Sequence, residues 1–196
     1  MRFRSIGLCL TATVIPTILS AQAAQPKLTA AQEIAAAVSA APAELRDGAT
    51  VLGLRGFNTV KIREGTNDLV CLGPRDDPKL PFQVACYHKS LEPFMARGRA
   101  LRAEGVKDPE RDSVRFREIT SGKLKMPSTP SALYTLNGGS FDTTTNKVNG
   151  AKWLYVVYMP GATMASTGIS DKPAGTAPWI MFPGTPKAHI MFSPSM

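Results

Sequence analysis

The chain has 196 residues, of which 43% are hydrophobic and 19% are charged, and its formal net charge is +8. This length fits one compact domain and excludes a large multidomain enzyme, while the composition excludes a collagen-like or low-complexity chain. Three cysteines and two histidines are few for a structural zinc site, which needs a full set of nitrogen and sulfur ligands. We therefore predict a globular protein with no metal and no cofactor.

The first 23 residues have the features of a cleaved secretory signal. Arg2 and Arg4 precede an apolar run from Ile6 to Ser20, and the small-residue triplet Ala-Gln-Ala follows at 21–23. A charged start, an apolar middle and an A-x-A site are typical of a signal peptide. The apolar run is short for a bilayer-spanning helix, so a retained membrane anchor is the less favoured alternative.

Removal of residues 1–23 would leave a single globular domain, residues 24–196, with a net charge of +6 and no segment apolar enough to span a membrane. We predict that this basic, soluble product is secreted to the periplasm or the extracellular space. Only Cys71 and Cys86 remain in it, and an even number of cysteines in an oxidising compartment favours a disulfide. A reactive thiol pair is less favoured, because redox pairs usually have the C-x-x-C spacing.

The first half of the mature chain contains signals for one helix and several strands. Thr29 and Gln32 fit a capping box, which predicts an alanine-rich helix that ends or kinks at Pro42. Runs of β-prone residues then predict three strands linked by hairpin turns, at 50–54, 59–63 and 69–72. A strand or an extended segment is expected at 82–88.

The middle of the chain indicates one or two further helices. Apolar residues recur at helical spacing from Ser90, and Gly105 is suited to end that helix. Asp108-Pro109-Glu110 is a good start for another helix. The segment that follows is ambiguous, because the spacing of Val114 and Phe116 also fits a strand.

The last third is rich in β-branched and aromatic residues. Strands are predicted at 132–136, 153–159, 179–182 and 188–192. Asn149-Gly150 favours a tight hairpin between 147–148 and the strand at 153, and Pro160-Gly161 and Pro183-Gly184 favour type II turns. The fold class is therefore α+β, a mostly antiparallel sheet with an N-terminal helix, mid-chain helices and one disulfide.

Two short elements are the most distinctive in the sequence. One is Glu64-Gly65-Thr66-Asn67, which leads to Cys71, and the other is Pro183-Gly184-Thr185-Pro186-Lys187-Ala188-His189. Together they resemble a family of exported bacterial proteins of unknown function, and the likeness extends over most of the mature chain. The resemblance implies export and a shared fold, and it implies no activity and no catalytic residue.

The C-terminal strands group four side chains on one face. If residues 183–187 form the loop, Phe182 pairs with Ala188 and Met181 lies opposite His189. The two-residue period of a strand then gives the candidate binding residues Trp179, Met181, His189 and Met191. Thioether and imidazole groups suit Cu(I), so soft-metal (copper) handling is one hypothesis, and packing beneath a helix is the other.

The common catalytic motifs are absent. There is no G-x-S-x-G, H-E-x-x-H, G-x-x-x-x-G-K-[ST] or G-x-G-x-x-G pattern. We therefore favour an exported, non-catalytic binding or interaction domain of unknown molecular function. The alternative is a hydrolase or other small-molecule enzyme that uses His88 or His189 as its base.

Basic residues concentrate between Arg97 and Lys125, where nine of them are interleaved with five acidic residues. An anionic envelope surface is a possible partner for this stretch. Few aromatic residues lie among the charges, so no nucleic-acid partner is expected. Mixed charge on exposed helices is the alternative explanation.

Overall fold

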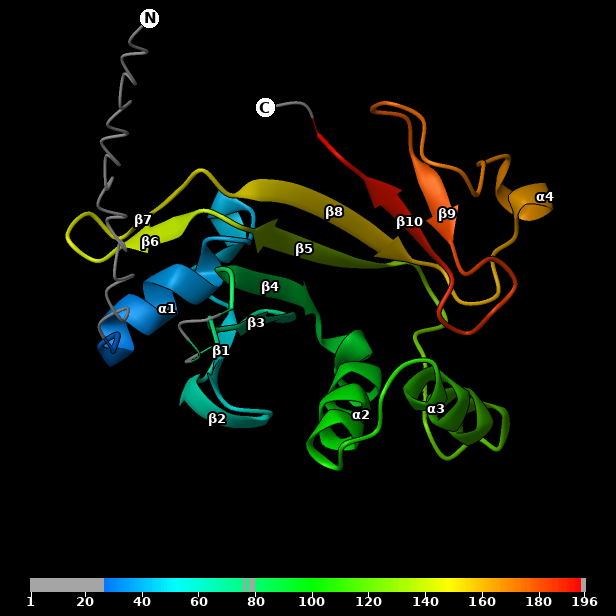
Figure 1. Cartoon of the computed structure of the whole chain (residues 1–196), viewed down its shortest axis with the longest axis horizontal. Helices are drawn as coiled ribbons and strands as arrows, with labels where there is room; N and C mark the ends of the chain where they lie inside the picture. The colour runs from blue at the N-terminus through cyan, green and yellow to red at the C-terminus, as the bar shows by residue number, and fades with distance from the viewer. Residues whose placement is uncertain (1–26, 76, 78–79, 195–196) are drawn as a thin grey trace, which may run out of the picture.

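The computed structural model describes residues 27–75, 77 and 80–194. The predicted signal peptide, residues 1–23, lies outside these residues. Eight strands form one sheet in the order β2-β1-β3-β4-β5-β8-β10-β9, and β6 and β7 form a separate two-stranded sheet (Figure 1). Every pair of neighbours is antiparallel except β1 and β3. The predicted α+β class is confirmed.

The helices are α1 (Ala30–Val38), α2 (Glu92–Ala103), α3 (Glu110–Thr120) and α4 (Met164–Thr167), with short 3-10 turns η1 (Ala43–Leu45) and η2 (Lys89–Leu91). The strands are β1 (Thr50–Arg55), β2 (Asn58–Arg63), β3 (Leu69–Leu72), β4 (Gln83–His88), β5 (Ser131–Asn137), β6 (Ser140–Asp142), β7 (Lys147–Asn149), β8 (Lys152–Tyr158), β9 (Trp179–Met181) and β10 (His189–Phe192). The Thr29–Gln32 capping box is present at the start of α1.

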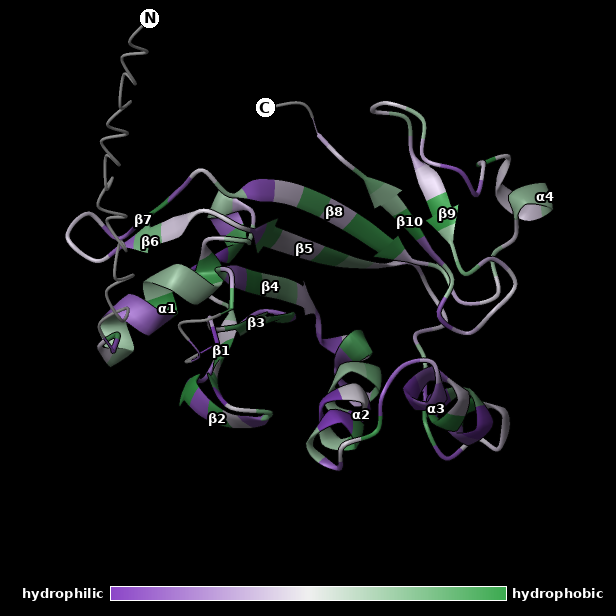
Figure 2. Ribbon diagram, in the orientation of Figure 1, coloured by the Kyte–Doolittle hydropathy of each residue, from purple (hydrophilic) through white to green (hydrophobic). Residues whose placement is uncertain are grey.

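The sheet carries apolar side chains on both faces because residues alternate along each strand. On one face, which we call the α1 face, Val51 and Cys71 pack with Ala37 of α1. On the other, the α2 face, Val70 packs with Phe94 of α2. Figure 1 shows α1 at the β1–β4 end of the sheet, with the long strands β5 and β8 running beyond it. Figure 2 shows α3 largely in hydrophilic colours.

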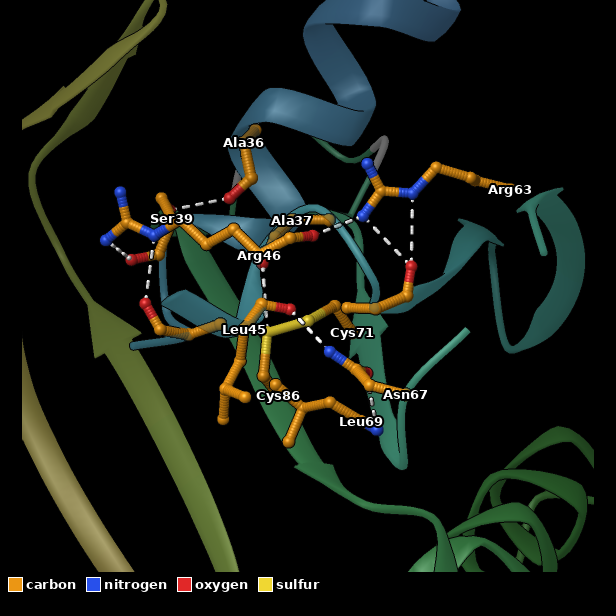
Figure 3. The surroundings of a disulfide bond; sticks show 12 residues. Ala36, Ala37, Ser39, Leu45, Arg46, Arg63, Asn67, Leu69, Cys71 and Cys86 are labelled. Carbon is orange, nitrogen blue, oxygen red and sulfur yellow. Dashed lines mark hydrogen bonds between the residues drawn. A yellow bond between two sulfur atoms is a disulfide. The ribbon is translucent and has the colours of Figure 1, made fainter. Parts of the chain in front are cut away.

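The predicted disulfide joins two strands in the middle of the α1 face. Cys71 of β3 and Cys86 of β4 lie directly opposite each other, with a Cα–Cα distance of 4.0 Å and a sulfur–sulfur bond. Both residues are fully buried. Figure 3 shows the disulfide beneath α1, where Cys86 Sγ lies 3.4 Å from the carbonyl oxygen of Ala37. The bond therefore holds together two of the strands on which α1 packs.

Polar side chains satisfy the backbone of the segment that follows α1. Arg46 donates from Nε to the carbonyl oxygen of Ala41 and from Nη2 to that of Ser39, at 2.9 and 3.2 Å (Figure 3). Arg63 of β2 donates from Nε to the carbonyl oxygen of Ala49 at 3.1 Å. These arginines act as structural donors, since a buried carbonyl left without a partner is costly.

The Glu-Gly-Thr-Asn element returns the chain to the start of β1. The backbone N–H groups of Thr66 and Asn67 both donate to the carbonyl oxygen of Gly48, at 2.8 and 2.9 Å. Gly65 has no space for a side chain, because a Cβ there would lie 2.3 Å from the backbone nitrogen of Thr50. The expectation that all three early strands are hairpin-linked is therefore wrong for β3. The element places β3 parallel to β1, on the side away from β2.

The two Pro-Gly turns of the last third bind each other. Gly161 and Gly184 have φ angles of 78° and 75°, as the predicted type II turns require. The N–H of Gly161 donates to the carbonyl oxygen of Thr185 at 2.9 Å, and the N–H of Gly184 donates to that of Ala162 at 2.7 Å. This reciprocal contact joins the end of β8 to the loop between β9 and β10.

Three further details differ from or resolve the sequence expectations. Strand β7 pairs with β6 and not with β8, because Asp142 accepts hydrogen bonds from Thr144 and Thr145 and closes the turn between β6 and β7. Phe182 does not pair with Ala188: its φ of 54° takes it out of the strand conformation. The ambiguous segment around Val114 is helical, within α3.

Removing the disulfide should destabilise the fold strongly. The double variant Cys71→Ala/Cys86→Ala is expected to lose about 3 kcal/mol of unfolding free energy, because the bond closes a loop of about 15 residues in the unfolded chain. Urea unfolding of the oxidised protein and the variant measures the difference. Adding a reductant should lower the stability of the wild type and leave the variant unchanged. Equal stability of the two oxidised proteins would contradict this assignment.

Candidate functional site

The structure brings together the four residues singled out on the C-terminal strands. In the register of β9 and β10, Met181 lies opposite His189 and Trp179 lies opposite Met191, as predicted. All four belong to the α2 face, where Met191 packs against the core. Thus the geometric part of the prediction is confirmed, while a binding role for these residues stays a prediction.

His189 is the most buried of the four and is held firmly. Its Nδ1 lies 2.7 Å from the carbonyl oxygen of Lys187, so the neutral ring carries its proton on Nδ1 and has a free lone pair on Nε2. The ring stacks on Tyr158 with centroids 4.9 Å apart, and Phe182 lies 5.8 Å away. Burial lowers the pKa of His189, and the nearby charge of Lys187 lowers it further, against the effect of the carbonyl.

From His189 a closed series of contacts extends to α3 and α2. The Nζ of Lys187 lies 4.2 Å from the ring centroid of Phe182 and donates to Asp112 at 2.8 Å. The other carboxylate oxygen of Asp112 accepts from Arg115, whose guanidinium lies 3.9 Å from the ring centroid of Phe94. The ring of Phe94 meets the edge of Tyr158, which completes the circuit. We call this set the His189 cluster: Phe94, Asp112, Arg115, Tyr158, Phe182, Lys187 and His189.

Charges in the His189 cluster interact across a largely buried space. Burial alone would raise the pKa of Asp112, but the hydrogen bonds from Lys187 and Arg115 hold that pKa below its usual range. Burial raises the pKa of Tyr158 to about 12. Asp112 is thus ionised and Tyr158 is protonated near neutral pH. The sequence pointed to His189 alone here, because the contacts with Asp112 and Arg115 join residues far apart in the chain.

The second histidine contacts a serine, as the hydrolase hypothesis requires. His88 Nδ1 lies 2.8 Å from Ser90 Oγ and accepts from the backbone N–H of Ser90 at 3.3 Å. Asp68 lies 3.9 Å from His88 Nε2, but its carboxylate binds Lys89 at 2.5 Å. The same bonds make His88 the N-cap of η2. A structural role therefore accounts for this contact, and an enzymatic role stays a prediction.

A groove on the opposite side of the sheet was not foreseen from the sequence. It has a volume of about 510 Å³ and lies over β5, β8 and β10, on the α1 face beyond α1. The residues that line it are Ala132, Tyr134, Tyr155, Val156, Val157, Thr176, Phe192, Ser193 and Pro194. None of them carries a charge, and the lining is mostly apolar. The alternation of strand residues could have indicated this face, since Tyr134 and Tyr155 point to the same side.

The aromatic residues in and beside the groove pack against one another. The rings of Tyr134 and Tyr155 meet edge to face with centroids 5.8 Å apart, and Trp153 contacts Tyr155 at 5.5 Å. Such contacts fix the orientation of the rings. Neither tyrosine hydroxyl has a hydrogen-bond partner within the described part of the chain. The groove therefore offers ring faces together with free hydroxyl groups.

Many charges of the basic stretch are already neutralised. Five of its nine cations form ion pairs with acidic residues: Arg97, Arg99, Arg111, Arg115 and Arg117. Among the residues that the structure describes, the other four have no such pair: Arg102, Lys107, Lys123 and Lys125. An anionic envelope surface as partner stays a prediction.

Comparison with protein-family models, curated proteins and solved structures finds no match. The resemblance to a family of exported proteins therefore stays a prediction. Within residues 27–75, 77 and 80–194, no group of three His, Cys, Asp or Glu residues is placed to hold a metal ion. In the same residues, no helix has the length and hydropathy needed to cross a bilayer.

The environment of His189 predicts a specific pH dependence. Its pKa lies below the ordinary value of 6.5, so only the unfolded chain gains a proton as the pH falls through about 6.5. The stability associated with keeping His189 neutral in the folded protein is therefore present in full above about pH 6.5, and it is lost as the pH falls towards the folded-state pKa. Between pH 7.5 and 5.5, wild type should lose more unfolding free energy than His189→Gln. An NMR titration midpoint of His189 at or above 6.5 would contradict the argument.

Proposed function

We propose that this protein is an exported, non-catalytic binding domain whose ligand occupies the groove on the α1 face. The ligand would be a neutral small molecule with an apolar ring face and hydrogen-bonding groups at its edge. The observation that supports this most directly is the lining itself, which presents aromatic rings and hydroxyl groups and no charge. The location would be the periplasm or the extracellular space.

The size and chemistry of the groove suit a small ligand. Ligand pockets are typically about 300–1,000 Å³, mostly apolar, with a few polar groups that fix orientation. The hydroxyls of Tyr134 and Tyr155, together with those of Thr176 and Ser193, supply such polar groups. A charged ligand is disfavoured, because no residue of the lining would compensate its charge.

The disulfide supports export. Cytosolic reductants keep most thiols reduced, so a buried structural disulfide is expected mainly in oxidising compartments. Cys71 and Cys86 form such a bond in the core. Together with the charged and apolar N-terminal segment, this supports the periplasm or the extracellular space as the site of action.

Blocking the groove should abolish binding of a neutral aromatic probe. N-phenyl-1-naphthylamine becomes fluorescent in apolar sites, and we expect saturable binding to the wild-type domain. Thr176→Trp would fill the groove from its exposed rim and should weaken binding about tenfold or more. Thr129→Trp, at an exposed position outside the groove, is the matched control and should bind like wild type. Absence of saturable binding, or equal binding by both variants, would refute the proposal.

Export can be tested on the protein recovered from a producing bacterium. Intact-mass analysis of the periplasmic or secreted product should show a chain that begins at Ala24, after the Ala-Gln-Ala site. Alkylation before and after reduction should reveal two thiols only after reduction, because Cys9 is removed with the signal. Material that stays in the cytosol and begins at Met1 would contradict export without bearing on the groove.

A further inference from the structure

The His189 cluster contains more positive than negative charge. Among the residues that the structure describes, Asp112 is the one carboxylate that both Arg115 and Lys187 contact, and burial keeps His189 neutral near pH 7. The side chains of Arg115, Asp112 and Lys187 are only 7%, 16% and 19% exposed. Water screens such charges weakly, so an excess of one cation in this position is costly unless an anion compensates it.

Arg115 also has a donor that no protein group accepts. Its Nη2 donates to Asp112 and its Nη1 donates to the carbonyl oxygen of Phe94 at 3.4 Å. Its Nε is buried and has no hydrogen-bond partner in the described part of the chain. Leaving a buried donor unpaired costs about 1–3 kcal/mol. An acceptor bound near Nε would remove that cost.

The geometry keeps the two cations close enough to share one small anion. Arg115 and Lys187 bind different oxygens of the same carboxylate, so the two cations lie on either side of Asp112. The guanidinium packs closely against α2, since a Cβ added at Gly98 would lie only 2.8 Å from Nη1. Within the described part of the chain the ammonium of Lys187 makes one hydrogen bond, so it has further N–H groups to donate.

We propose that the His189 cluster binds a small oxyanion, the carboxylate or phosphate group of a ligand, between Arg115 and Lys187. The anion accepts hydrogen bonds from the Nε of Arg115 and the Nζ of Lys187 and balances the excess positive charge. It enters on the side of Lys187, the most exposed of the three charged residues. This site is on the α2 face and is separate from the groove on the α1 face.

Equilibrium dialysis with radiolabelled inorganic phosphate at constant ionic strength tests the site. Wild type should bind about one phosphate per chain, and Lys187→Met, which removes the charge and keeps the apolar stem, should bind about tenfold more weakly. Lys172→Met removes an exposed lysine outside the cluster and should bind like wild type. Excess acetate should displace the label from wild type if carboxylates share the site, and failure to displace it restricts the ligand to phosphate groups.

A second measurement covers the case in which a variant does not fold. The Tm of the wild-type protein should be higher in phosphate than in chloride at equal ionic strength, because a ligand that binds only the folded state stabilises it. Arg115→Lys keeps the charge and loses the Nε donor, so its Tm gain in phosphate should be smaller. No saturable binding by wild type, or equal binding by wild type and Lys187→Met, would overturn the proposal.

Discussion

The sheet is wider than the helix α1 that packs on it, and this difference leaves part of the α1 face without α1 over it. At about 4.8 Å between strands, an eight-stranded sheet is about 34 Å wide. Helix α1 has nine residues. At about 1.5 Å per residue and about 10 Å in diameter, such a helix is about 14 Å long and covers only part of that width. It packs on β1, β3 and β4, so the α1 face over β5, β8 and β10 is left to other side chains.

Two separate sets of bonds hold the strands together at the end of the sheet that α1 covers. The disulfide joins β3 to β4 covalently, and the Glu-Gly-Thr-Asn element binds the carbonyl oxygen of Gly48 at the start of β1. Both act on the part of the sheet that α1 covers. The other half is held by the reciprocal hydrogen bonds of the two Pro-Gly turns and by aromatic contacts among Trp153, Tyr155 and Tyr134. The strands β1, β3 and β4, which the disulfide and the Glu-Gly-Thr-Asn element join, thus adjoin the part of the α1 face that α1 leaves uncovered.

Local signals in the sequence were sufficient for most elements and for the disulfide. The capping residues of α1, the register of Met181 opposite His189 and the pairing of Cys71 with Cys86 each depend on neighbouring residues or on simple counting. The predictions that were wrong concern which strands pair with each other. The parallel placement of β3 results from hydrogen bonds to Gly48, and the pairing of β7 with β6 results from a side chain in the turn, and neither leaves a periodic pattern.

The candidate sites show the same division between local and long-range information. Strand alternation places His189 with Met181, but Asp112 and Arg115 reach it only because α3 packs near the loop after β9. The distinctive Pro-Gly-Thr-Pro-Lys-Ala-His element supplies backbone contacts to the other Pro-Gly turn and a carbonyl to His189. Its role is therefore to hold the cluster in shape. The groove residues Tyr134, Tyr155 and Phe192 lie outside both distinctive elements, so these elements contribute to the frame of the fold and do not line the proposed binding groove.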